Sequence, residues 1–266
     1  MLQMYPRLKL CSYIMKITGV FGIAFLSVMK DQNMIGIILG ILYLLGVEIL
    51  FQSIARKRMQ KITRILTEEC KATEYLEEIK KYQSTNKFVD ASLKNMLALG
   101  YLYLGQYEEY LETLKSINID FKNNPAGVQS KIVYYNNLAV AYGRLNDVEK
   151  AGEMLDIMKN TIKETNKLSD IYKQKDMLQC KMVEISLDLK INPTEENYKK
   201  AEIIYLNSLE RAKENIEKVA LHALLADIYE KLGKTEQQER SMEYVLKNGG
   251  DTHFVQEIKN MKKCKE

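Results

Sequence analysis

The sequence predicts an all-α protein, in which an N-terminal hairpin of two transmembrane helices precedes an α-solenoid of stacked helical hairpins. Two observations lead to this prediction. Two long apolar segments occupy residues 10–29 and 34–51, and one apolar pattern recurs three times between residues 97 and 232. The composition agrees, because 266 residues with 46% hydrophobic content, three Pro and no Trp suit long helices around a packed core.

The two apolar segments are each long enough to cross a bilayer. Residues 10–29 contain one charged side chain, Lys16, and residues 34–51 contain one, Glu48. A hydrocarbon core of about 30 Å requires about 20 mostly apolar residues per helix. The polar residues 30–33 between the segments are typical of a short turn. A transmembrane hairpin at 10–51, preceded by a short segment at 1–9, is therefore predicted.

Two other interpretations of this region remain open. A cleaved signal peptide would need one shorter apolar core and a cleavage site with small residues, and Ser27-Val28-Met29 followed by a second apolar run does not supply them. A helical hairpin buried in a soluble core is compatible with the moderate apolarity of the first segment, which contains Lys16 and Thr18.

The flanking cations predict the orientation of the hairpin. Cations concentrate on the cytoplasmic side of membrane helices. They precede or begin the first segment and follow the second, whereas the turn balances Lys30 against Asp31; the flanking residues are Arg7, Lys9, Lys16, Arg56, Lys57, Arg58, Lys61 and Arg64. We therefore expect a cell-membrane protein with two spans and both termini in the cytoplasm. The basic run after the second span is expected to contact anionic lipid.

Lys16 and Glu48 are expected to lie at nearly equal depth in the hairpin. Lys16 precedes Lys30 by fourteen residues, and Glu48 follows Asn33 by fifteen. In an antiparallel pair of helices this spacing allows an intramembrane ion pair. Separate snorkelling of each side chain to the interface is the alternative.

The recurring pattern is Leu-Ala-x-x-Tyr-x-x-Leu, and it begins at Leu97, Leu138 and Leu225. Its apolar residues fall on one face of an α-helix. Each copy ends in a residue that accepts the left-handed conformation of a tight turn, namely Gly105, Asn146 and Gly233. Apolar residues recur at helical spacing after the tight turns at Gly105 and Asn146, so each unit is predicted to be a helix-turn-helix.

These residues resemble the tetratricopeptide repeat, which has this pattern of small residues and Tyr in its first helix, followed by a Gly turn. The likeness is closest in the units around Tyr101 and Tyr142, and weaker around Tyr229. The spacings of 41 and 87 residues between copies exceed the family's unit of about 34. Longer helices or loops are therefore expected.

The regions between the copies contain further predicted elements. Residues 52–84 are expected to form basic juxtamembrane and capping helices, and 85–266 the repeat domain, with a loop at 123–127. A divergent unit is predicted from a helix at about 168–189, a break at Asn192-Pro193, and a second helix through Tyr198 and Leu209. Asn192 and Glu195 have the spacing of a capping box at the start of that second helix.

The resemblance implies a concave groove that binds a protein or peptide. In the family, Asn side chains on the first helix of each repeat grip the backbone of an extended peptide. The corresponding residues are Asn95 and Asn136, with Tyr103, Arg144 and Lys231 on the next turn. A merely solvated role for the two Asn residues remains the alternative.

Residues typical of catalysis or metal binding are sparse. Cys11, Cys70, Cys180 and Cys264 form no Cys-x-x-Cys motif, and two His occur in the chain. No basic run is interleaved with aromatic residues as in nucleic-acid grooves. We therefore expect no enzyme activity, metal, cofactor or nucleic-acid partner. The expected function is that of a membrane-anchored tetratricopeptide adaptor, and the alternative is a peptide-responsive regulator tethered to the membrane.

Overall fold

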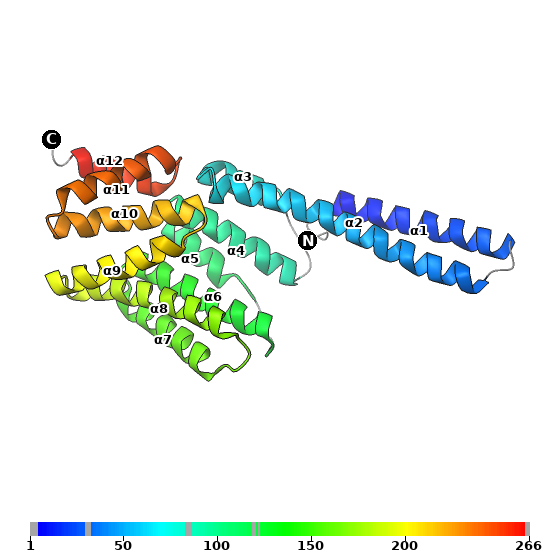
Figure 1. Cartoon of the computed structure of the whole chain (residues 1–266), viewed down its shortest axis with the longest axis horizontal. Coiled ribbons are helices and arrows are strands. Elements are labelled where there is room, and N and C mark those ends of the chain that lie inside the picture. Colours follow the sequence, from blue (N-terminus) through cyan, green and yellow to red (C-terminus); the bar gives the residue numbers. More distant parts are fainter. Residues whose placement is uncertain (1–4, 30–32, 83–86, 119–120, 122, 264–266) are drawn as a thin grey trace.

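The chain is helical throughout the part that the structure describes. The structure is a computed structural model that describes residues 5–29, 33–82, 87–118, 121 and 123–263. Within these ranges twelve α-helices and no strand occur, which confirms the predicted all-α class (Figure 1). An elongated pair of helices projects from a compact group formed by the others (Figure 1).

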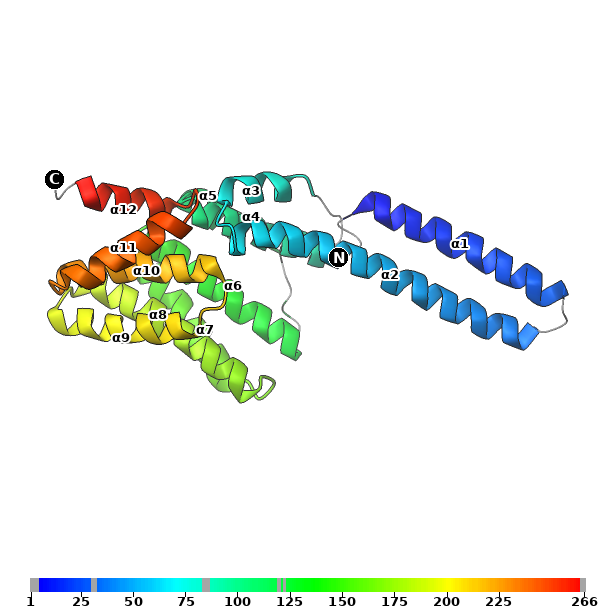
Figure 2. The same cartoon turned by 45° about the horizontal axis from the view of Figure 1, so that its top comes forward.

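The projecting pair consists of α1 (Pro6–Met29) and α2 (Asn33–Thr67), which lie side by side in both views (Figures 1 and 2). Helix α2 passes without a break from its apolar half into the basic run at 56–64. It stays helical beyond residue 51 because apolar residues keep helical spacing there, and these are buried: Ala55, Met59, Ile62 and Leu66. Helix α3 (Ala72–Lys80) follows after a short turn.

One helix meets the requirements of a membrane span by length and composition among the described residues. It is the part of α2 from Gly36 to Thr67, and 11% of its apolar window is buried. The segment predicted as the first span forms α1, but its role as a span stays a prediction, as does the orientation. Of the turn predicted at 30–33, residues 30–32 lie outside the described residues and Asn33 begins α2.

Helix α3, four helical hairpins and a final helix make up the compact group. Each helix packs on its neighbours in sequence. The pairs are α4 (Lys87–Tyr103) with α5 (Tyr107–Lys115), α6 (Pro125–Arg144) with α7 (Val148–Glu164), α8 (Asp170–Ile191) with α9 (Glu195–Arg211), and α10 (Asn215–Lys231) with α11 (Thr235–Asn248), followed by α12 (His253–Lys263).

The turns inside three of these hairpins adopt the predicted left-handed backbone. The φ angles are 74° at Gly105, 62° at Asn146 and 66° at Gly233. This conformation is open to Gly and tolerated by Asn, which explains why these residues end the recurring pattern.

Two helix starts differ from the prediction. The capping box at Asn192 and Glu195 is wrong: Asn192 ends α8, and the hydroxyl of Thr194 accepts a hydrogen bond from the backbone N–H of Asn197 at 3.3 Å to start α9. The helix therefore begins beyond Pro193, where a hydroxyl can cap it. The loop predicted at 123–127 is shorter, because Asn124 caps α6 and Gly127 lies in its first turn.

The two ends of the compact group share one hydrophobic core. Buried residues of α2, of α3 and of the turn between them pack with residues of α10, α11 and α12. The set includes Ile62, Leu66, Cys70, Ala72, Ile216, Val219, Val245, Phe254 and Ile258. Figure 2 shows α3 and α12 on the same side of the molecule. The helical array thus returns on itself, and the end of α2 is built into this core.

Polar contacts fasten the same junction. The carboxylate of Asp251 accepts hydrogen bonds from the backbone N–H groups of Ala72 (2.5 Å) and Thr73 (3.1 Å), and so caps α3 from the other end of the chain. The side-chain amide of Asn215 donates to the carbonyls of Glu68 and Asn248, both at 3.1 Å. The position of α2 relative to α10 and α12 is therefore fixed by directional bonds as well as by packing.

Candidate binding pocket

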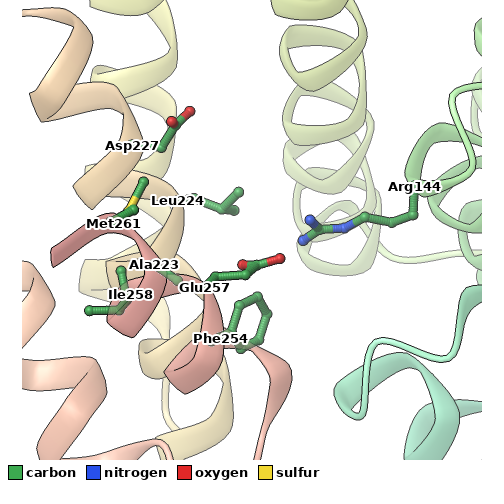
Figure 3. A pocket seen from close by; sticks show the side chains of 8 residues that line it. All are labelled: Arg144, Ala223, Leu224, Asp227, Phe254, Glu257, Ile258 and Met261. Carbon is green, nitrogen blue, oxygen red and sulfur yellow. The ribbon is translucent and has the colours of Figure 1, made fainter. Parts of the chain in front are cut away.

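A pocket of about 280 Å³ lies where the end of α6 faces α10 and α12. Its apolar lining comes from α10 and α12, and its charged lining from all three helices (Figure 3). The lining residues are Arg144, Ala223, Leu224, Asp227, Phe254, Glu257, Ile258 and Met261. We call the apolar part of this lining the apolar floor; it consists of Ala223, Leu224, Phe254, Ile258 and Met261. The pocket thus combines this apolar floor with one cation and two carboxylates.

Arg144 occupies one side of the pocket and points toward Glu257 on the other (Figure 3). The guanidinium lies 5.7 Å from the centre of the Tyr107 ring, where a cation–π contact holds it. Arg144 forms no ion pair with any residue that the structure describes. Its five N–H donors therefore keep capacity for a carboxylate or a carbonyl of a bound segment.

The pocket shifts the pKa values of its acidic groups upward. Desolvation by the surrounding protein raises the pKa of the Glu257 carboxyl, and the positive charge of Arg144 opposes this rise. Desolvation likewise raises the pKa of Asp227, while nearby Lys231 opposes it. Both residues still contact solvent, and the side chain of Glu257 is 49% exposed. A bound cation or N–H donor would therefore find partly desolvated acceptors here.

His253, beside the pocket, is held neutral. Its ring lies 3.1 Å from the carbonyl of Tyr103 through Nδ1, and its side chain is 9% exposed. Burial, opposed by the hydrogen bond to Tyr103 and aided by the charge of Arg144, lowers the pKa of His253 to about 4. The first turn of α12 is therefore attached to the end of α4 by an uncharged imidazole at neutral pH.

Three of the residues predicted for the groove are placed at or near this pocket. Arg144 lines it directly. Tyr103 contacts Phe254 of the lining edge to face, with ring centres 6.3 Å apart. Lys231 lies one helical turn after Asp227 and forms an ion pair with Glu230 at 3.3 Å.

The two predicted Asn residues are placed elsewhere. Asn95 lies eight residues before Tyr103, and Asn136 lies eight residues before Arg144. Eight residues correspond to about 12 Å along a helix. The amide nitrogen of Asn95 donates to the carbonyl of Ala91 at 3.1 Å. The side-chain oxygens of Asn95 and Asn136 are enclosed and have no hydrogen-bond partner among the described residues. In this conformation neither oxygen is presented to a ligand.

Lys16 and Glu48 contact each other in the hairpin. The ammonium of Lys16 forms an ion pair with the Glu48 carboxylate, and the amide of Gln52 donates to the other carboxylate oxygen at 2.8 Å. The contact joins α1 to α2. Its place inside a membrane stays a prediction.

The lining residues of α10 and α12 were not identified from the sequence. Helix α12 stands outside the recurring pattern, so its contribution was not anticipated. A local signal exists, because Phe254, Ile258 and Met261 recur at helical spacing and mark an apolar stripe. Asp227 and Glu257 carry no such signal, since single carboxylates on helices are usually solvated.

The pocket presents one guanidinium and two carboxylates beside apolar side chains. No group of three or more His, Cys, Asp or Glu side chains placed to hold a metal ion occurs in the part of the chain that the structure describes. The arrangement can bind a segment that combines an apolar side chain with polar ends. No family model, curated protein or solved structure matches this chain.

Proposed function

We propose that this chain is a membrane-anchored adaptor with tetratricopeptide-like repeats, and that it binds a protein or peptide segment on its cytosolic side. The observation that carries the binding proposal is the guanidinium of Arg144, which lines a pocket with an apolar floor and has no ion-pair partner among the described residues. Because a buried or half-buried Arg is normally paired, such a group favours an external carboxylate or carbonyl as its partner. The apolar floor would take a neighbouring aliphatic or aromatic side chain.

The proposal of a repeated array has support in equivalent contacts between successive hairpins. Lys80, the last residue of α3, lies 5.3 Å from the ring centre of Tyr101 in α4. Lys115, the last residue of α5, lies 5.3 Å from the ring centre of Tyr142 in α6. The pair formed by the end of α2 and α3 therefore contacts the first repeat (α4 and α5) in the same way as the first repeat contacts the second (α6 and α7).

The proposal of an anchor rests on the surface of the projecting pair. Large apolar side chains of α1 and α2 are exposed along their length, including Leu10, Ile14, Ile17, Phe21, Ile38, Leu42, Leu45 and Ile49. A contiguous exposed apolar surface of this extent is unfavourable in water and matches a lipid environment. This exposure does not fit a hairpin buried in the chain's own core.

Site-directed photocrosslinking in membranes tests the binding pocket. A photoreactive amino acid at Leu224 should give a discrete crosslinked product, and Arg144→Ala should reduce its yield. The same amino acid at Ile203, which is 61% exposed on α9 and does not line the pocket, is the control. Equal products from both positions, or a yield indifferent to Arg144, would place the binding surface elsewhere.

Topology reporters test the anchor and its orientation. A reporter active only in the cytosol should be active after Glu266 and inactive when inserted at Gln32. The full chain should remain in the membrane pellet after carbonate extraction. Release into the supernatant would contradict the anchor, and the reverse reporter pattern would contradict the orientation.

A further inference from the structure

Helix α8 begins with two neighbouring apolar side chains that are largely exposed. Ile171 is 80% exposed and Tyr172 is 56% exposed. In both views the turn between α7 and α8 lies at the end of the compact group that faces the projecting hairpin, and the turn between α8 and α9 lies at the opposite end (Figures 1 and 2).

This end of the group is held at a fixed position relative to the hairpin. Helix α2 is continuous from its apolar half into the core shared with α10 and α12, so no flexible linker separates them. The turn before α8 is itself tied to the loop before α6, because the ammonium of Lys167 donates to the carbonyl and the side-chain oxygen of Asn123 at 2.5 and 2.6 Å. Orientation of α2 across a bilayer would therefore set which end of the group faces the membrane.

The charges around the two apolar side chains favour an anionic surface. The segment 163–175 contains four lysines, Lys163, Lys167, Lys173 and Lys175, against Glu164 and Asp170. Tyr prefers the membrane interface because its ring is apolar and its hydroxyl is polar. Lysines beside an interfacial aromatic add attraction to anionic headgroups.

We propose that Ile171 and Tyr172 form a second membrane contact, in which the first turn of α8 inserts into the interface of an anionic bilayer. This inference rests on the anchor proposed above. Two points of attachment would restrain the tilt of the repeat domain, and would hold the pocket at the end of α6 in one orientation to the membrane.

Tryptophan fluorescence tests the contact directly, because the chain contains no Trp. The full chain is reconstituted, one copy per nanodisc, in a mixture of zwitterionic and anionic lipids, some brominated near the headgroup end of the acyl chain. Tyr172→Trp should give fluorescence that is quenched by the brominated lipid and shifted to the blue. Quenching should weaken in purely zwitterionic nanodiscs and in the background Lys163→Glu with Lys173→Glu.

Two further variants, each with a single tryptophan, separate the possible outcomes. Ile191→Trp, at the opposite end of α8 and 68% exposed, should remain unquenched. Ile49→Trp, 68% exposed in α2, should be quenched if α2 lies in the bilayer. Quenching at position 49 without quenching at position 172 overturns the second contact and leaves the anchor. Absence of quenching at position 49 overturns the anchor and the inference that rests on it. Equal quenching at positions 172 and 191 means non-specific adsorption, and this result also overturns the inference.

Discussion

Gly19 and Tyr43 lie in contact across the α1–α2 interface, and a Cβ atom at position 19 would overlap Cε1 of the Tyr43 ring. The same tyrosine donates its hydroxyl hydrogen to the carbonyl of Met15 at 2.9 Å. The absence of a side chain at position 19 therefore gives the ring space to reach α1. The hairpin is joined at two levels, by this contact and by Lys16 with Glu48.

Gly19→Ala should destabilise the hairpin by displacing the Tyr43 ring. The displaced ring loses its hydrogen bond to Met15, which corresponds to about 0.5 to 1.5 kcal/mol. Tyr43→Phe should have a similar effect, and the double variant should lose little more than either single one, because both remove the same bond. Thermal unfolding of the full chain in a mild detergent measures the effects. Fully additive losses would show that the two residues act independently.

Charge reversal tests the contact between Lys16 and Glu48. Lys16→Glu or Glu48→Lys alone should lower the amount of chain that is stably inserted, because two like charges would then face each other between apolar helices. The double exchange restores an ion pair and should recover most of the loss. Quantification of carbonate-resistant protein provides the measurement. A double variant as poor as the single ones would favour separate snorkelling.

Gly250 should be far less tolerant of Ala than Gly233, although both have positive φ. A Cβ at position 250 would overlap the backbone oxygen of Cys70, whereas a Cβ at position 233 meets nothing within 4 Å. Gly233→Ala should cost about 1 kcal/mol of backbone strain. Gly250→Ala should cost about 1 to 3 kcal/mol more from overpacking against an immobile carbonyl. Denaturant unfolding of both variants gives the comparison, and equal losses would mean that the junction between residues 70 and 250 yields easily.

His253 should make the fold less stable in acid. Its pKa is about 4 in the folded chain and about 6.5 when unfolded, so only the unfolded chain binds the proton between these values. The contribution of neutral His253 to the free energy of unfolding is therefore fully present above pH 6.5. It is lost as the pH falls toward 4, to a total of about 3 kcal/mol.

Comparison with His253→Asn isolates this contribution. The variant should lose less stability than the natural chain between pH 6.5 and 4, since its amide does not titrate. Urea unfolding midpoints at several pH values measure the difference. The carboxylates and His222 titrate in both proteins, so their effects cancel in the comparison. Parallel pH profiles would contradict the buried neutral state of His253.

The Asn95→Ala and Asn136→Ala double variant should leave stability unchanged or raise it. The enclosed side-chain oxygens have no partner among the described residues, and Ala is the better helix former by up to about 0.7 kcal/mol per site. If the side chains rotate to grip a bound backbone, affinity for a crosslinked partner should fall about tenfold or more. An affinity that does not respond to the double variant would leave the Arg144 pocket as the main contact.

The local pattern predicted the helical class and several element boundaries. Tight turns at Gly105, Asn146 and Gly233 were predicted because the left-handed backbone restricts the residue type at one position. The start of α9 was predicted two residues early, because Asn192 and Thr194 are both acceptable caps and their choice depends on how α8 ends. The pair of Lys16 and Glu48 could be anticipated because equal depth follows from counting residues.

The sequence by itself determined what depends on neighbours along the chain, namely which segments are helical, where they turn, and that one end is strongly apolar. Tertiary structure alone decided that Asp251 caps α3, that α2 is built into the core of α10 and α12, and that Arg144 faces Glu257. The physical reason is that helical periodicity fixes which face of a helix is buried, but leaves open which distant helix covers it. The pocket depends on that second choice, which is made by packing complementarity between residues 79 to 117 positions apart along the chain.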